Sequence, residues 1–379
     1  MTPACAADYR ALARRRVPRV LFDYLDGGAY AEATLARNLA DLQAIALRQR
    51  VLKDVSSLST GVELFGQAMS MPLALAPIGM AGMYARRGEV QAMRAAKAAG
   101  VPMCLSTVSV CDLGEVTRDG GAPPWFQLYM IRDRGYMAEL LARAGELGAP
   151  VLVFTVDLPV PGARYRDVRN GLFGAGAMTE ISRAVDGLSH PDWLLDVWFR
   201  GGPHSFGNIA AAIPEARGIL EFWPWVGRNF DPSLSWKDLD WVRAHWKGPI
   251  VLKGVLDAED ARMAADAGLE GLVVSNHGGR QLDGVLSGAA ALPAIAAAVG
   301  ERMTVLMDGG VRSGLDVLKA LALGADGVLI GRAWAYALAA RGEAGVAHVL
   351  QIIRQELLTA MALTGCTDVR QAGRELLAG

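Results

Sequence analysis

The run Gly271-Leu272-Val273-Val274-Ser275-Asn276-His277-Gly278-Gly279-Arg280-Gln281-Leu282-Asp283 passes from an apolar segment into a polar loop within a few residues. Its first four residues have the apolar, β-branched character of a buried strand. The loop that follows carries a histidine, two glycines and an arginine. A strand that ends in such a loop places an acid–base side chain beside a planar cation that can hold a carboxylate.

Seven further apolar runs have the same strand-like character, and nearly all of them are followed by a helical pattern. They span residues 72–77, 103–107, 125–129, 151–157, 250–254, 304–308 and 327–331. The helical patterns cover residues 89–99, 112–117, 136–147, 258–267, 290–299 and 315–323, and the C-terminus. Alternating strands and helices predict an α/β protein with a parallel sheet and right-handed crossovers. Eight such units predict a closed (β/α)8 barrel, the TIM barrel.

Two parts of the chain fall outside this repeat. Residues 1–70 are predicted to be an N-terminal helical segment, with one helix over 8–16 and another that starts at Pro18 and stops at Gly27-Gly28. Residues 158–235 form an insertion between strands four and five, far longer than an ordinary strand-to-helix connection. We therefore expect a single barrel domain over residues 1–379 that carries a helical extension and this insertion.

The insertion and the segment after it are rich in tryptophan, with aromatic runs at residues 193–199 and 222–226. A subdomain with its own small core, or an oligomer contact, would account for these residues. A peripheral membrane contact through residues 165–230 would account for them equally well, because Trp favours the headgroup region of a bilayer. The sequence has no run of about 18 apolar residues and no signal-peptide pattern at its start. We expect the protein at the cytoplasmic side of the inner membrane, or otherwise in the cytoplasm.

The overall composition excludes several classes of site. Hydrophobic residues make up 52% of the chain and charged residues 20%, which suits a globular protein with a large core. The net charge of −1 gives no indication of a nucleic-acid partner. The four cysteines form no CxxC pair, and no histidine stands at metal-ligand spacing, so neither a metal site nor a disulfide is predicted.

Polar residues collect at the carboxyl ends of the predicted strands, the face that carries the active site in barrels of this kind. They are Ser106, Gln127, Tyr129, Thr155, Asp157, Lys253, Ser275, His277 and Asp308. Each one alone is more often a satisfied polar residue at a strand end. Together they are hard to explain as core packing, so we expect a site at this face.

Glycine-rich loops follow the last two predicted strands, as Asp308-Gly309-Gly310-Val311-Arg312 and as Gly331-Arg332. Barrels often bind phosphate with these two loops, where glycine exposes backbone N–H groups. Arg312 and Arg332 would add charge-assisted hydrogen bonds. Tight turns are the alternative reading of such loops, but their place after strands seven and eight favours a phosphate site.

The run from Ser275 to Asp283 resembles the active-site signature of the FMN-dependent α-hydroxy-acid dehydrogenases and oxidases. Further matches follow in order along almost the whole chain: Phe22-Asp23-Tyr24, Phe126-Gln127-Leu128-Tyr129, Thr155-Val156-Asp157, Pro161-Gly162-Ala163-Arg164, Ser235-Trp236-Lys237-Asp238, Leu252-Lys253-Gly254 and Asp308-Gly309-Gly310-Val311-Arg312. Within the family, residues 26–30, 82–90 and 105–111 are most similar to the bacterial respiratory L-lactate dehydrogenases, which are linked to quinones.

The resemblance implies roles for six residues around the substrate. His277 would be the catalytic base, and Asp157 would orient it and stabilise its cation. Arg280 would hold the substrate carboxylate through two hydrogen bonds, with Arg164 as a second, more mobile contact. Tyr24 would lie on the carboxylate and Tyr129 near the hydroxyl.

The resemblance also implies FMN as the cofactor. Lys253 would lie at the pyrimidine edge of the flavin and stabilise its anionic reduced ring, although a Lys paired with a neighbouring carboxylate is the simpler reading. The residues that would hold FMN are Pro77, Ile78, Gly79, Ser106, Gln127, Thr155, Lys253, Ser275, Asp308, Gly309, Gly310, Arg312, Gly331 and Arg332.

The reaction implied is oxidation of L-lactate to pyruvate, with mandelate, glycolate or another L-2-hydroxy acid as the alternative substrate. His277 would remove either the hydroxyl proton, with hydride transfer, or the C2 proton, to give a carbanion. Gly79 stands where the oxidases tend to have Ala, and Val108 stands where the plant glycolate oxidases tend to have Trp. In the family such a Gly goes with dehydrogenase behaviour, so a quinone or another electron acceptor is expected in place of oxygen. The resemblance also suggests a homotetramer.

Overall fold

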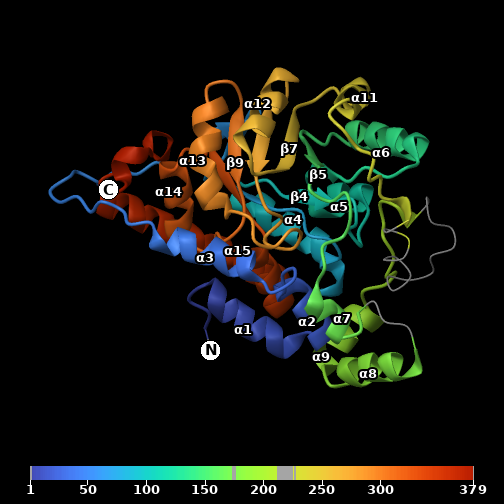
Figure 1. Ribbon diagram of the computed structural model, residues 1–379. Coiled ribbons are helices and arrows are strands. Elements are labelled where there is room, and N and C mark those ends of the chain that lie inside the picture. Colours follow the sequence, from blue (N-terminus) through green and yellow to red (C-terminus); the bar gives the residue numbers. More distant parts are fainter. Residues whose placement is uncertain (1, 173–175, 211–224, 226–227, 379) are drawn as a thin grey trace.

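Eight parallel strands form the centre of the molecule, as Figure 1 shows for the computed structural model, which describes residues 2–172, 176–210, 225 and 228–378. The strands run in the order β3-β10-β9-β8-β7-β6-β5-β4. A parallel bridge between Leu75 and Met103 joins the two outer strands, so the sheet closes on itself. The predicted TIM barrel is confirmed. Its strands are β3 (Leu73–Leu75), β4 (Cys104–Ser106), β5 (Trp125–Leu128), β6 (Leu152–Thr155), β7 (Ile250–Val255), β8 (Gly271–Val274), β9 (Thr304–Met307) and β10 (Gly327–Ile330).

Helices surround the barrel, and side-chain caps begin many of them. Asp112, Asp133, Asp257, Ser287 and Ser313 each accept a hydrogen bond from a backbone N–H in the first turn of the helix that follows. Each of these caps lies at the end of the loop that connects a strand to the next helix, where the chain turns back along the sheet. The helices are α4 (Gly88–Ala99), α5 (Leu113–Gly120), α6 (Arg134–Glu146), α12 (Ala258–Asp266), α13 (Gly288–Val299), α14 (Gly314–Ala322) and α15 (Arg332–Thr364), and η5 (Val369–Gln371) and η6 (Arg374–Leu376) follow them.

Three helices precede the barrel: α1 (Ala6–Arg16), α2 (Arg19–Asp26) and α3 (Ala33–Ala44). In Figure 1, α1 lies beside α15, and α3 lies against α13 and α14. The hydroxyl of Tyr9 in α1 lies 2.7 Å from Nδ1 of His348 in α15. The N-terminal extension is therefore packed against the last long helix of the barrel.

The prediction of a helical segment over residues 1–70 is wrong at its end, where residues 62–69 form a hairpin. Strands β1 (Val62–Leu64) and β2 (Gln67–Met69) are antiparallel and meet at a turn in which Phe65 and Gly66 both have positive φ. The Phe65 ring packs edge-on against Trp125, 5.6 Å between centroids. Trp125 begins β5, so the hairpin covers the amino end of the barrel and leaves the carboxyl end for the site.

The insertion after β6 contains α7 (Tyr165–Arg169), α8 (Ala177–Leu188), α9 (Pro191–Trp193) and the π-helix η2 (Leu194–Phe199), and α11 (Asp238–His245) follows it. Trp193 is buried and donates to the carbonyl of Met83, whereas Trp198 is half exposed. Of the aromatic run predicted at residues 222–226, only Trp225 is described, and it is buried. Within the described part of the chain, no helix is long and apolar enough to cross a membrane.

Candidate active site

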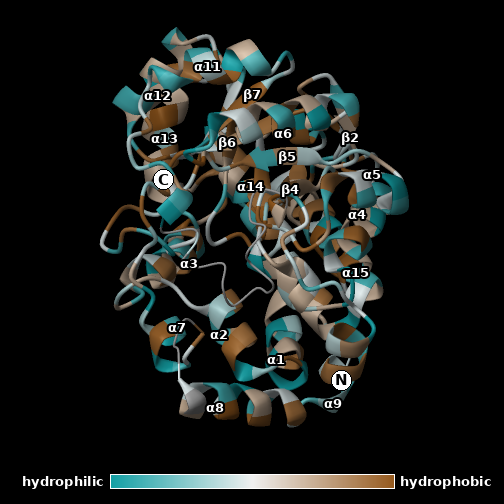
Figure 2. Ribbon diagram, turned by 90° about the vertical axis from the view of Figure 1, so that its right-hand side faces the viewer, coloured by the Kyte–Doolittle hydropathy of each residue, from teal (hydrophilic) through white to brown (hydrophobic). Residues whose placement is uncertain are grey.

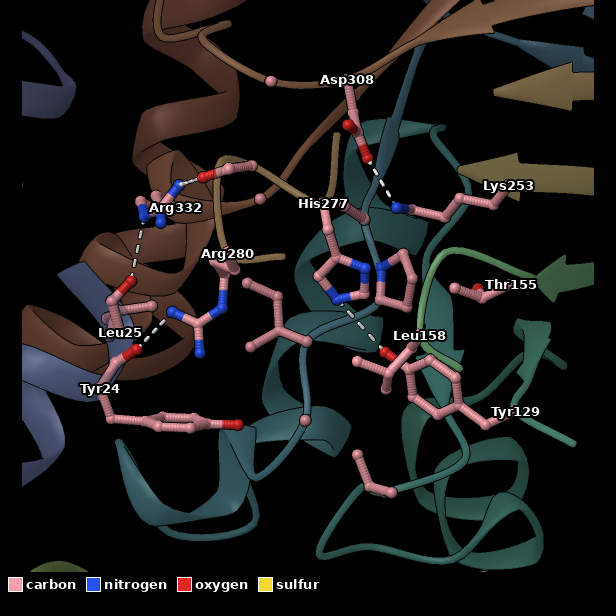
Figure 3. A pocket seen from close by; sticks show the side chains of 18 of the residues that line it. Tyr24, Leu25, Tyr129, Thr155, Leu158, Lys253, His277, Arg280, Asp308 and Arg332 are labelled. Carbon is pink, nitrogen blue, oxygen red and sulfur yellow. Dashed lines mark hydrogen bonds and ion pairs between the residues drawn. The ribbon is translucent and has the colours of Figure 1, made fainter. Parts of the chain in front are cut away.

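The carboxyl ends of the barrel strands surround a cavity with about 1070 Å³ of empty space, part of it open to solvent. Figure 3 shows the side chains that converge on it from β6, β7 and the loops after β8, β9 and β10. Most of the predicted site residues line this cavity: Tyr24, Pro77, Ile78, Gly79, Tyr129, Thr155, Arg164, Lys253, His277, Arg280, Asp308, Gly309, Gly310, Arg312, Gly331 and Arg332.

Four predicted site residues do not line the cavity and lie behind those that do. Asp157 is bonded to His277, and Ser275 accepts a hydrogen bond from Lys253. Ser106 and Gln127 are bonded to each other through Oγ and Oε1, 3.1 Å apart. These four residues therefore support the side chains at the cavity wall.

His277 lies between a carboxylate and a phenol. Its Nδ1 is 2.8 Å from Oδ1 of Asp157, and its Nε2 is 3.4 Å from the hydroxyl of Tyr129. Figure 3 shows the imidazole and the phenol side by side. A carboxylate can only accept a hydrogen bond, so the proton of a neutral imidazole resides on Nδ1. Nε2 then presents a lone pair to the cavity, which is the arrangement that a general base requires.

Asp157 stays ionised beside this histidine. Burial acts to raise the pKa of its carboxyl, but His277 and then Lys253 outweigh burial and hold that pKa below its ordinary value. An ionised Asp157 stabilises the imidazolium that forms when His277 takes a proton.

The loop that carries His277 has an uncommon backbone. His277 has φ +58°, and Gly278 and Gly279 continue with φ +64° and +72°. Asn276 fixes the loop through a reciprocal pair with Asn38 of α3, in which each amide donates to the other at 2.9 and 2.7 Å. Nothing local in the sequence singled out Asn38, because its partner is 238 residues away.

Two guanidinium groups lie close to the ring of Tyr24. The Arg280 guanidinium carbon lies 4.7 Å from the ring centroid, and that of Arg164 lies 5.4 Å from it. Arg164 is also 3.6 Å from a carboxylate oxygen of Asp167. Two partly buried cations beside one aromatic ring make this end of the cavity suitable for a carboxylate.

Backbone carbonyls at the carboxyl end of α2 accept hydrogen bonds from Arg280 and from Arg332, the first residue of α15. Arg280 donates to the carbonyls of Tyr24 and Gly27 at 2.5 and 3.1 Å. Arg332 donates to Leu25 and Gly27 of the same segment at 3.0 and 2.8 Å, and to Gly278 at 2.9 Å (Figure 3). Burial lowers the pKa of Arg332 to about 10. The prediction placed Arg332 at a phosphate; the structure adds that it ties α2 to the loop of His277.

Lys253 is buried near the carboxyl end of β7. It is paired with a carboxylate, as the alternative interpretation of the sequence predicted. Its Nζ lies 3.0 Å from Oδ2 of Asp308 and donates to Oγ of Ser275 at 2.9 Å. Burial acts to lower the pKa of Lys253, but Asp308 and Asp157 raise it above the ordinary value. Lys253 therefore carries a permanent positive charge at the cavity wall.

Several buried polar atoms at this wall are left without a hydrogen-bond partner among the described residues. They include Nε2 of Gln127, Oγ1 of Thr155 and Oδ1 of Asp308. Buried polar atoms are rarely left unpaired in folded proteins. The amide donor of Gln127 behind the wall, the Thr155 hydroxyl and the neighbouring Lys253 cation match the carbonyl and N–H edge of a flavin, so these residues fit FMN.

The loops after β9 and β10 fit the phosphate end of the same cofactor. Gly309 and Gly310 have φ +86° and +92°, where a side chain would be strained. A Cβ at Gly310 would lie 2.0 Å from the Asn38 carbonyl, so only glycine fits there. Arg312 lines the cavity, and burial lowers its pKa below the ordinary value. The long helix α15 begins at Arg332, so its N-terminus also faces the cavity.

Sequence reasoning did not select Tyr84, which also lines the cavity, or Phe230, whose ring lies 5.2 Å from that of Tyr129. Tyr84 belongs to the stretch 82–90 that resembles one subgroup, which is the signal that could have found it. Phe230 comes from the long insertion, where no strand rhythm predicts which residues reach the site.

Comparisons with known proteins agree with this architecture. The family model described as "FMN-dependent dehydrogenase" matches residues 13–379. The chain is 62% identical to the L-lactate dehydrogenase of Caulobacter sp. (strain K31), covering 100% of this chain and 99% of that protein. It is 56% identical to the L-lactate dehydrogenase of Stenotrophomonas maltophilia (strain R551-3), again over 100% of this chain and 99% of the relative.

Solved structures superpose over the full length. The monotopic membrane protein (S)-mandelate dehydrogenase matches with a TM-score of 0.93 and 35% identity, covering 100% of both chains. A mandelate oxidase with (S)-4-hydroxymandelic acid matches with a TM-score of 0.86 and 40% identity, covering 99% of this chain and 98% of that one.

Proposed function

Because the chain belongs to the FMN-dependent dehydrogenase family, we propose that it oxidises L-lactate to pyruvate and passes the electrons to a quinone. The observation that carries this proposal is the placement of His277, with Nδ1 on Asp157 and Nε2 facing the Tyr129 hydroxyl. A base with its free nitrogen in the cavity, next to two partly buried arginines, suits proton removal from a small 2-hydroxy acid.

In the mechanism that follows, Arg280 and Arg164 bind the carboxylate, and both guanidinium groups lie close to the Tyr24 ring. His277 accepts the substrate proton at Nε2, and Asp157 stabilises the resulting cation through Nδ1. Tyr129, within reach of the same nitrogen, orients the substrate hydroxyl. Bound FMN would supply the two-electron oxidant and would take up the second hydrogen that the substrate loses.

The residues proposed to hold FMN divide by chemistry. Gln127 and Thr155 supply hydrogen bonds to the polar edge of the ring, and Lys253 supplies a positive charge. The loops at Gly309-Gly310 and Gly331, with Arg312, bind the phosphate. Arg332 contributes the start of α15 and positions the loop of His277.

An anaerobic absorption spectrum of the purified protein tests the cofactor and the substrate together. We expect a yellow protein whose flavin absorbance is bleached within seconds by L-lactate, because the base and the arginines meet at one face of the cavity. D-lactate should leave the absorbance unchanged, since its hydroxyl and hydrogen exchange places relative to His277. A colourless protein, or a flavin that L-lactate does not bleach, would contradict the proposal.

Mandelate is the second candidate substrate, because solved relatives act on it. The relatives named L-lactate dehydrogenase are more similar in sequence, at 62% and 56% identity. We therefore expect bleaching by L-lactate to be faster than bleaching by (S)-mandelate or glycolate at equal concentration, and the reverse order would replace lactate in the proposal.

The same sample tests the electron acceptor. Gly79 leaves no side chain on the loop after β3, and a Cβ there would lie 2.7 Å from Cγ2 of Val108. With Gly at this position we expect the bleached protein to recover slowly in air and rapidly with a soluble quinone. Fast, stoichiometric formation of peroxide in air would rule out the quinone.

A peripheral membrane contact through the insertion belongs to the same proposal. Met178, Ile181, Val185 and Leu188 of α8 follow one another at helical spacing and are 79%, 56%, 60% and 68% exposed. Figure 2 shows α8 at the periphery, with hydrophobic residues along it. One solved relative is described as a monotopic membrane protein. Such a stripe suits an interfacial helix that brings the site close to a lipid-soluble acceptor.

Vesicle sedimentation checks this contact. Each large apolar side chain buried in lipid contributes about 1.5 to 3 kcal/mol, so the double variant Ile181→Asp/Val185→Asp should bind vesicles of phosphatidylethanolamine and phosphatidylglycerol at least roughly tenfold more weakly. Leu363→Asp is the matched control, since Leu363 of α15 is 55% exposed and lies outside the insertion. Equal binding of both variants would refute the contact.

The homotetramer suggested by the resemblance is checked by light scattering of the wild-type protein.

A further inference from the structure

Tyr84 is a buried phenol at the wall of the cavity. It follows the short helix η1 (Ala81–Met83), in the loop between β3 and α4. Its side chain is 0% exposed and yet lines the cavity together with Tyr24, Arg164 and Arg280. The mechanism above assigns it no role.

The hydroxyl of Tyr84 has no hydrogen-bond partner in the described part of the chain. A buried polar group that stays unpaired costs about 1 to 3 kcal/mol, and buried tyrosines usually find a partner for this reason. Tyr336 of α15 illustrates the usual case, since it is buried and its hydroxyl donates to Asp26 at 2.7 Å. Tyr84 is an exception that a ligand in the cavity would remove.

The surroundings of Tyr84 favour an anion as that ligand. Burial raises the pKa of its phenol well above the ordinary value, Tyr24 raises it further, and Arg280 opposes the shift. The phenol therefore stays neutral and keeps its O–H to donate. Arg280 and Arg164 bring positive charge to the same part of the cavity, so the acceptor that fits is a carboxylate oxygen.

The loop holds Tyr84 in place before any ligand binds. Arg16 donates to the backbone carbonyl of Tyr84 at 3.0 Å. A Cβ at Gly82 would lie 2.7 Å from that of Val110, and one at Gly88 would lie 2.4 Å from the carbonyl of Ala81. Such close packing on both sides leaves the loop little freedom, so the hydroxyl is preorganised.

We propose that Tyr84 is a further substrate-binding residue, whose hydroxyl donates a hydrogen bond to the carboxylate held by Arg280 and Arg164. The inference rests on the proposed function, because the carboxylate is that of the 2-hydroxy acid. Tyr84 adds a third hydroxyl to those of Tyr24 and Tyr129. It lies in the loop after β3, which otherwise contributes only Pro77, Ile78 and Gly79 to the predicted site.

Titration of the FMN-loaded protein with oxalate tests this role without turnover, because oxalate carries a carboxylate beside a second oxygen, as the 2-oxo product does. The change in flavin absorbance gives Kd. In Tyr84→Phe we expect Kd to rise about tenfold or more, the loss of one hydrogen bond to a charged group. Tm should stay the same or rise, since the variant removes an unpaired polar atom and no protein hydrogen bond. With L-lactate, KM should rise more than kcat falls.

Tyr9→Phe is the matched control. Tyr9 is also 0% exposed, but its hydroxyl is bonded to His348 between α1 and α15. This variant should lower Tm and leave the Kd for oxalate unchanged. An oxalate Kd for Tyr84→Phe within twofold of wild type overturns the inference alone, and so does a fall in Tm without a change in Kd. A wild-type protein that does not bind oxalate overturns the proposed function as well.

Discussion

Replacing His277 with Asn should slow reduction of the flavin by L-lactate by about 10²- to 10⁴-fold, the range expected when a general base is lost. Asn is chosen because His277 has φ +58°, and Asn adopts positive φ more readily than most residues. Its amide has no basic nitrogen, so the substrate proton has no acceptor at this position. Anaerobic stopped-flow mixing measures the rate of bleaching in a single turnover.

Two controls separate loss of the base from loss of the site. The variant should retain the yellow colour, because His277 is not among the residues proposed to hold FMN. Asp157→Asn should also slow bleaching, since an amide cannot stabilise the imidazolium as the carboxylate does. Bleaching of His277→Asn at a rate near that of wild type would show that another group takes the proton.

The second large effect is expected from Arg280→Lys, which keeps the positive charge and removes the planar pair of donors. A lysine presents a single point charge, so it cannot bind a carboxylate with two parallel hydrogen bonds and also donate to the carbonyls of Tyr24 and Gly27. We expect the Kd for oxalate and the KM for L-lactate to rise about 100-fold, within the range of 2 to 5 kcal/mol for truncating one partner of a buried charge pair.

Arg164→Lys is the comparison for this variant. Arg164 also faces the Tyr24 ring, at the longer distance of 5.4 Å, and it has Asp167 beside it. Its replacement should weaken oxalate binding less than Arg280→Lys does. The thermal midpoint must be recorded for both variants, because Arg280 also secures α2. Equal losses in the two variants would contradict the assignment of Arg280 as the main carboxylate contact.

The barrel could be predicted because its strands are buried on both faces and read as continuous apolar runs. The run 151–157, for example, contains β6 at Leu152–Thr155. The hairpin at residues 62–69 could not, because its strands have three residues each and depend on the contact between Phe65 and Trp125. The hairpin is stabilised by a contact with a residue distant in the sequence, so local periodicity does not predict it.

The site shows the same division. Lys253, His277 and Asp308 could be placed at one face because each ends a strand or follows one. Asn38 could not, since it reaches the site from a helix outside the barrel. Tyr84 is a lone aromatic residue in a loop, and only the resemblance of residues 82–90 pointed to it. For Arg332 the position was predictable, but its three carbonyl partners lie 54 to 307 residues away.

Helix α2 is made early in synthesis, but the arginines that bond to the carbonyl groups at its carboxyl end are made much later. The partners of Tyr24, Leu25 and Gly27 are Arg280 and Arg332, the latter separated from Leu25 by 307 residues. On the ribosome, where the N-terminal part emerges first, the Leu25 carbonyl lacks its Arg332 partner until β10 has been made. Closure of so long a loop is slow. The nascent protein therefore has no competent substrate pocket until nearly all of it has been translated.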